Sequence, residues 1–96
     1  MTNESLAIWK EAITRAMYIL EERPGQWITL TEFESAWKRF SGELFRARTL
    51  GVRGTRDFLD RLQRVGLVLL DESDFPVMRI RRNPAEPLLQ LEAPGA

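Results

Sequence analysis

The chain has 96 residues, a formal net charge of zero and 44% hydrophobic residues, a composition typical of one folded domain with a single modest core. It contains no cysteine and no histidine, so disulfides, thiolate chemistry, the commonest zinc ligands and the commonest general base are excluded. No apolar run approaches the roughly 20 residues of a membrane span, and the N-terminus lacks the pattern of a signal peptide. We therefore expect a cytoplasmic protein, or a nuclear one in a eukaryote, with no metal, no cofactor and no membrane partner.

The first segment predicts an amphipathic helix. Its apolar residues recur at spacings of three and four, which places them on one helical face; they are Leu6, Trp9, Ile13, Ala16, Met17 and Leu20. We expect Trp9 and Met17 to lie in the core. Asn3 or Ser5 can cap the start, and Arg23-Pro24-Gly25 ends the helix because proline disfavours a helical conformation in the residue before it.

A short strand and a second helix are predicted next. The strand contains aromatic and β-branched residues, namely Trp27, Ile28 and Leu30. Thr31 and Glu34 have the spacing of a capping box, which predicts a helix start. The buried face of that helix is expected to contain Phe33, Ala36, Trp37 and Phe40. Ser41-Gly42 then ends it.

Residues 43–51 show no single pattern, although Leu44, Phe45 and Leu50 are apolar enough to anchor them to the core. The following stretch, GTRDFLDRLQRVG, predicts a third helix with its apolar residues at Phe58, Leu59, Leu62 and Val65. Gly66 supplies a left-handed C-terminal cap. The helix starts either with Thr55 as its cap or earlier, near Gly51.

After Gly66 the hydrophobic period becomes that of a strand. LVLLDE and VMRIR predict a β-hairpin, and DESDFP between them supplies a loop of about four to six residues. Residues 83–96 hold three of the five prolines and are expected to form an extended, partly disordered tail. Helix, strand, helix, helix and hairpin is the order of a winged helix-turn-helix. The sequence thus predicts an α+β fold of three helices and a small antiparallel sheet, over residues 4–82.

The stretch WITLTEFESAWKRFSGELFRARTLGVRGTRDFLDRL resembles the OST-HTH/LOTUS domain, and the resemblance extends over residues 5–82. It is carried by Ile28-Thr29-Leu30, Phe33, Trp37, Phe40, Gly42, Leu44, Leu50-Gly51, Phe58-Leu59 and Leu62. Leu50 and Val52 stand where the family often has aromatic residues. The resemblance implies an RNA-linked binding module without catalytic residues. Members of the family bind RNA, including G-rich structured RNA, or a DEAD-box helicase, and bacterial members accompany a NYN-type nuclease domain.

One pair of carboxylates could in principle perform acid–base catalysis. Asp57 and Asp60 are three residues apart on the third helix and share a face. Arginines flank them at spacings of three and four, however, so intrahelical ion pairs explain them better. The glycine-rich segment from Gly51 to Thr55 lacks the spacing of a phosphate-binding loop. We therefore expect a protein that is not an enzyme.

Positive charge is concentrated in the middle of the chain, because residues 38–66 carry eight Lys and Arg against three Asp and Glu. In a helix-turn-helix domain the start of the third helix can meet nucleic acid, and its amides favour a phosphate. Arginine suits both phosphates and guanine edges. We therefore expect a surface for RNA or another nucleic acid that consists of Lys38, Arg39, Arg46, Arg48, Arg53 and Arg56.

Other partners stay open. The predicted wing loop is acidic and the isoelectric point is about 6.3, which argues against a DNA-binding transcriptional regulator. A protein partner, such as a helicase or an assembly partner, would contact the third helix, the wing and the tail. Phe75, at the tip of the wing, could stack on a base, but we expect it to pack on its own hairpin or to contact a protein. The arginines could also be an ordinary solvated surface.

Overall fold

A computed structural model of the chain describes residues 2–84. Its elements are α1 (Asn3–Glu21), β1 (Ile28–Thr29), α2 (Leu30–Ser41), α3 (Ala47–Leu50), α4 (Thr55–Arg64), β2 (Val68–Asp74) and β3 (Val77–Arg82). The strands form one antiparallel sheet in the order β1-β3-β2. Three longer helices with a small antiparallel sheet confirm the predicted α+β class, in an arrangement compatible with a winged helix-turn-helix.

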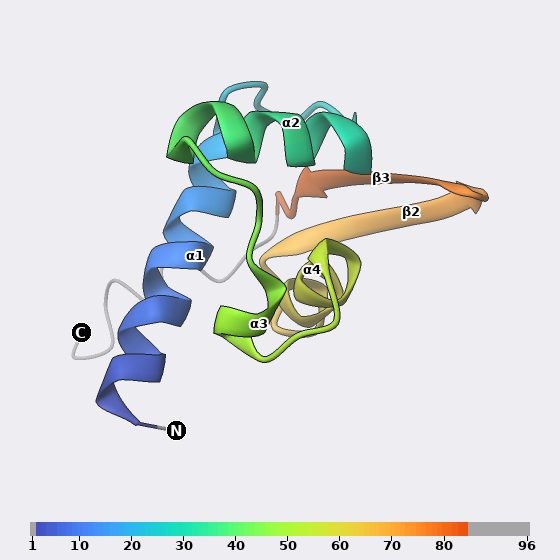
Figure 1. The fold of residues 1–96 in the computed structure, drawn as a ribbon. Helices are drawn as coiled ribbons and strands as arrows, with labels where there is room; N and C mark the ends of the chain where they lie inside the picture. The colour runs from blue at the N-terminus through green and yellow to red at the C-terminus, as the bar shows by residue number, and fades with distance from the viewer. Residues whose placement is uncertain (1, 85–96) are drawn as a thin grey trace, which may run out of the picture.

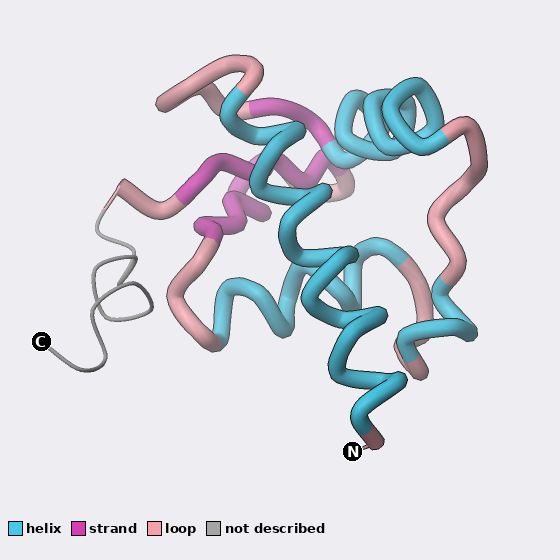
Figure 2. Tube along the Cα trace, turned by 90° about the vertical axis from the view of Figure 1, so that its left-hand side faces the viewer, coloured by secondary structure: helices cyan, strands magenta, loops and turns pink. Residues whose placement is uncertain are grey.

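The helices surround one end of the sheet, and the β2–β3 hairpin extends away from them (Figure 1). In that view α2 lies above the hairpin and α4 below it. Figure 2 shows α1 in the foreground, with the strands behind its C-terminal half. The contacts agree, since α1 packs against α2, α3 and β3, while α4 packs against β2. The largest fully buried side chains are Phe33, Phe58, Leu59, Leu62, Val68 and Ile80.

The N-cap of α1 lies one residue before Asn3 and three residues before Ser5, the two predicted caps. Thr2 is the N-cap, and its hydroxyl oxygen accepts the N–H of Ser5 at 3.0 Å. The prediction of Asn3 or Ser5 is therefore wrong, because a threonine three residues before Ser5 satisfies that amide. Trp9 and Met17 are partly buried and pack against the core. The helix ends at Glu21, close to the predicted proline–glycine stop.

The capping box of α2 lies two residues before the predicted one. Thr29 Oγ1 accepts the N–H of Glu32 at 3.1 Å, and Glu32 Oε1 accepts the N–H of Thr29 at 2.9 Å. Thr29 is still paired with Arg79 of β3, so strand and helix meet without a connecting residue. Leu30 is consequently the first residue of α2 and not part of the strand. The bond from the Thr29 backbone, with the Thr29 side chain and Arg23, lowers the pKa of Glu32.

Phe40 and Val65, which were predicted for the buried faces of two helices, are exposed. Phe33, Ala36 and Trp37 are buried as predicted, but Phe40 lies in the last turn of α2 and stays exposed. Val65 is 61% exposed, because it is the C-cap of α4, where the chain turns away through Gly66. Gly66 has the expected left-handed conformation, with φ of 83°.

The connection after α2 contains a helical turn that the sequence pattern did not predict. Gly42 ends α2 with φ of 80°, as expected. α3 follows, and it has no side-chain cap. Leu50 is buried and Phe45 packs against the core, as predicted, but Leu44 is 68% exposed. Four residues are too short for a helical period to be visible in the sequence.

The hairpin is tighter than predicted. Its strands reach Asp74 and Val77, which pair with each other, so the turn contains only Phe75 and Pro76. The predicted loop of about four to six residues is therefore wrong. A register irregularity lies between Asp71 and Asp74, where two residues of β2 stand opposite one residue of β3, as in a β-bulge. The predicted disorder of the tail concerns residues that, from 85 onward, lie outside the described part of the chain.

Candidate binding surfaces

The six basic residues predicted to bind nucleic acid come from three places in the fold. Lys38 and Arg39 lie in the last turn of α2, and Arg46 and Arg48 lie at the start and in the body of α3. Arg53 precedes α4, and Arg56 lies in its first turn. All six side chains are exposed. The structure thus distributes them over several elements instead of placing all of them on one helix.

Three of these six residues are already paired with carboxylates. Arg39 contacts Glu22 at the end of α1, with 3.1 Å between nitrogen and oxygen. Arg46 pairs with Glu43 and Arg56 pairs with Glu72 of the wing strand β2. Within residues 2–84, the side chains of Lys38, Arg48 and Arg53 form no ion pair.

At the start of α4, a carboxylate of the chain itself binds the backbone. Asp57 Oδ2 accepts the backbone N–H of Arg53 at 3.0 Å, where a phosphate was expected to contact the backbone. This bond, together with the charge of Arg61, lowers the pKa of Asp57. Both predicted intrahelical pairs are present, with Arg61 3.6 Å from Asp57 and Arg64 2.9 Å from Asp60. The outer face of α4 therefore carries charge that is largely compensated.

The β2–β3 wing is acidic, and two of its carboxylates already form an ion pair or hydrogen bonds within the chain. Asp74 binds Arg79 at 3.2 Å, and Asp71 accepts the N–H and the hydroxyl of Ser73. The Ser73 bonds lower the pKa of Asp71. Phe75 at the tip is 74% exposed, so it does not pack on its own hairpin. The expected contact of Phe75 with a protein stays a prediction.

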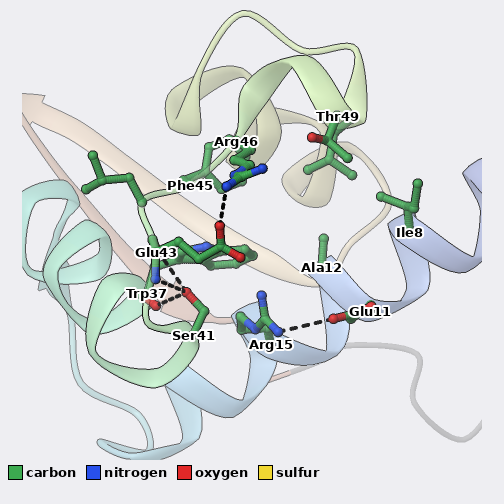
Figure 3. Close-up of a pocket in the computed structure, with 12 residues that line it drawn as sticks. Ile8, Glu11, Ala12, Arg15, Trp37, Ser41, Glu43, Phe45, Arg46 and Thr49 are labelled. Atoms are coloured by element: carbon green, nitrogen blue, oxygen red, sulfur yellow. Dashed lines mark hydrogen bonds and ion pairs between the residues drawn. The ribbon is translucent and has the colours of Figure 1, made fainter.

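A groove that the sequence pattern did not reveal lies between α1, the end of α2, and the segment that leads into α3. We call it the α1–α2 groove. It has a volume of about 190 Å³ and is lined by Ile8, Glu11, Ala12, Arg15, Trp37, Ser41, Glu43, Leu44, Phe45, Arg46, Thr49 and Leu50. Apolar side chains form its floor. Figure 3 shows the ion pairs Glu11–Arg15 and Glu43–Arg46 at its edges.

Packing and hydrogen bonds hold the groove in shape. The rings of Trp37 and Phe45 meet edge to face with centroids 5.1 Å apart, and the guanidinium of Arg15 lies 5.4 Å from the Trp37 ring centre. The hydroxyl of Ser41 lies 2.7 Å from the carbonyl oxygen of Trp37, and it accepts the N–H of Glu43 at 3.3 Å. The groove is therefore preformed in the unbound chain.

An exposed pair of aromatic residues, Tyr18 and Phe40, lies beyond the groove, toward the C-terminal end of α1. Tyr18 is 66% exposed, and its ring meets Phe40 edge to face at 5.3 Å. One helical stripe links this pair to the groove, since Ile8, Glu11, Arg15, Tyr18 and Glu22 follow each other at spacings of three and four. This second stripe of α1 lies beside the apolar face that packs on the core. Its spacing is visible in the sequence and could have indicated the surface formed by the groove and the aromatic pair.

Among the described helices, none is long and apolar enough to cross a membrane. The same part of the chain contains no group of three or more carboxylates that could hold a metal ion. Comparisons with protein-family models, with curated proteins and with solved structures give no significant match.

Proposed function

We propose that this chain is a non-catalytic, winged-helix-like binding module, and that its partner is a protein that inserts an apolar side chain into the α1–α2 groove. One observation carries the proposal: the groove has an apolar floor around Trp37 and Phe45, and its edges are charged pairs. An apolar centre with a polar rim is the usual anatomy of a protein interface. Aromatic and arginine side chains are also enriched among the residues that dominate binding energy.

The distribution of charge favours a protein over a polyanion. Nucleic-acid affinity depends on lysines and arginines that neutralise phosphates. Here Arg39, Arg46 and Arg56 already have carboxylate partners, and Asp57 accepts the amide at the start of α4. A phosphate at any of these places has to displace a carboxylate or lie beside one.

The size of the α1–α2 groove and the charges at its edges limit which side chain of a partner can enter it. A volume of about 190 Å³ accommodates one large apolar side chain and no more. The two edges carry charges of both signs, so they select no strongly charged ligand. A partner helix or extended segment with one leucine, methionine or aromatic anchor meets these conditions. Tyr18 and Phe40 extend the contact beyond the anchor.

A selection of random peptides displayed on phage, made against the whole chain at physiological salt, tests this proposal. We expect the selected peptides to share one apolar anchor and to lose binding to Thr49→Phe, which fills the groove from an exposed position. Thr14→Phe is the matched control, since Thr14 is exposed on α1 and does not line the groove. Peptides that bind both variants equally, or a selection that yields no shared anchor, would contradict the proposal.

Nucleic acid is the second candidate partner, and it is favoured by one observation. Arg48 lies in α3 and Arg53 lies two residues before α4; both are exposed and form no ion pair within residues 2–84. Surface ion pairs contribute only about 0–1 kcal/mol each, so Arg56 could also exchange Glu72 for a phosphate. The acidic wing favours RNA over a DNA duplex in this case. Membership of the OST-HTH/LOTUS family and a cytoplasmic location stay predictions.

A further inference from the structure

The outer face of the sheet carries an arginine that is held in place by an aromatic ring. Arg81 of β3 lies opposite Leu69 of β2 in the strand register. On its other side is Trp27, the residue before β1, because Ile28 pairs with Ile80 in an antiparallel register. The guanidinium of Arg81 lies 5.4 Å from the centre of the Trp27 ring. This stacking fixes the side chain on the sheet surface.

Arg81 differs from the other arginines of β3, because no carboxylate within residues 2–84 pairs with it. Arg79 binds Asp74 at 3.2 Å, and Arg82 binds Glu21. In the described part of the chain, Arg81 forms no ion pair and no hydrogen bond through its side chain. The Nε atom of Arg81 is buried and has no hydrogen-bond acceptor in the described structure, whereas the two terminal amino groups of Arg81 are not buried. A buried donor that lacks an acceptor costs roughly 1–3 kcal/mol, so its presence calls for an explanation.

A cavity of about 250 Å³ opens beside this arginine, and we call it the Arg81 cavity. The residues within 2–84 that line it are Glu21, Pro24, Gly25, Arg81, Arg82 and Pro84. The described residues that line it include two arginines and one glutamate, and Glu21 forms an ion pair with Arg82. The excess of one positive charge belongs to Arg81. Trp27, which is 40% exposed, contacts the guanidinium of Arg81 and is not among the described residues that line the cavity.

We propose that the Arg81 cavity binds a carboxylate of a partner protein, presented by an aspartate, a glutamate or a C-terminus. The planar guanidinium matches a carboxylate in a two-bonded geometry. A single carboxylate also matches the single excess positive charge among the described lining residues, whereas a polyanion carries more negative charge than they can neutralise. The proposal rests on the proposed function in assuming a protein partner, but the cavity shares no lining residue with the α1–α2 groove.

Titration of the ¹⁵N-labelled full chain with small probes tests the proposal by NMR. The probe is acetyl-Leu-Asp-amide, the neutral match is acetyl-Leu-Asn-amide, and inorganic phosphate is the third ligand. We expect the Asp probe to shift the Trp27 indole and Arg81 Nε–H signals in a saturable manner, and the Asn probe to shift neither. Arg81→Gln should weaken the binding at least about tenfold, the loss of one charged hydrogen bond. Arg64→Gln, which removes an exposed arginine on α4, is the matched control and should not change it.

Several outcomes would overturn the carboxylate site. These are an absence of saturation, equal responses to the Asp and Asn probes, unchanged binding in Arg81→Gln, and tighter binding of phosphate than of the Asp probe. Arg81→Lys keeps the charge but loses the planar fork, so binding as tight as that of the native chain would also overturn it. Thr49→Phe separates this proposal from the groove, because it should abolish the binding of groove peptides and leave the response to the Asp probe intact.

Discussion

The hydroxyl of Thr55 donates a hydrogen bond to a carboxylate oxygen of Glu34 at 2.9 Å, and this bond joins α4 to α2. Thr55 is the first residue of α4 and the one buried polar residue among those the structure describes. Glu34, which sequence spacing assigned to a capping box, is free to accept this bond because Glu32 forms the box instead. The contact therefore helps to set the angle between α2 and α4.

Loss of this bond should destabilise the domain. Thr55→Val keeps the shape of the side chain and removes the donor, so we expect the free energy of unfolding to fall by about 1 kcal/mol. Urea denaturation followed by circular dichroism measures the change. Thr14→Val is the control, since that threonine is exposed on α1, where substitutions usually stay within about 0.5 kcal/mol. Equal losses in the two variants would show that the contact with Glu34 contributes nothing.

The position of the capping box predicts which of two threonines matters for α2. Thr29→Ala removes the N-cap hydroxyl and should cost about 1 kcal/mol of stability. Thr31→Ala, two residues later, should cost less, because Thr31 is an exposed residue inside the helix and alanine is a strong helix former. Thermal denaturation of both variants gives the comparison. A larger loss for Thr31→Ala would instead support the box that spacing alone predicted.

Acid should remove part of the stability through Asp57. Its pKa in the folded chain is lowered from the ordinary value of 3.8, chiefly by the N–H of Arg53. A lowered pKa stabilises the folded state above the ordinary pKa, and this contribution is lost as the pH falls through the folded pKa. Asp57→Asn should therefore lower the melting temperature at neutral pH and flatten its decline in acid.

The control for this pH dependence is Asp60→Asn on the same helix. Asp60 pairs with Arg64 but accepts no backbone N–H in the described structure. Melting curves recorded from neutral pH to well below pH 3.8 compare the two variants with the native chain. If Asp57→Asn follows the native decline in parallel, the hydrogen bond from Arg53 makes no contribution through the carboxylate.

The nucleic-acid alternative makes a separate prediction about salt. If RNA binds at the start of α4, log K should fall linearly with log salt, and Arg48→Glu with Arg53→Glu should abolish the binding. Neutralising these two arginines to Gln should lower the slope by about 1.4, since each phosphate contact in a single strand contributes about 0.7. Fluorescence anisotropy with single-stranded, duplex and G-rich RNA measures both. Arg61→Gln with Arg64→Gln, which removes two paired arginines, should lower the slope less.

A flat response to salt would exclude this alternative. So would the absence of binding to all three kinds of RNA at low salt. In either case the protein partner would remain as the function that the groove supports, and the peptide selection would decide it independently.

Sequence alone determined the kind of fold and most of its elements. Apolar residues at spacings of three and four identified the long helices, because only one face of each meets the core. Gly42 and Gly66 identified two helix ends, because both adopt left-handed backbone conformations that suit glycine. The change of period after Gly66 identified the hairpin. The intrahelical pairs of Asp57 and Asp60 also followed from spacing, since residues four apart are neighbours on a helix.

Tertiary structure decided the details on which function depends. Two overlapping capping boxes had the same spacing, and pairing of Thr29 with Arg79 selected the first. Arg56 was expected to be available, and its partner Glu72 lies 16 residues away on another element. The α1–α2 groove and the stacking of Arg81 on Trp27 both depend on segments that meet only after folding. The reason is physical: spacing reveals which residues share one element, whereas charge compensation and cavities depend on contacts between elements.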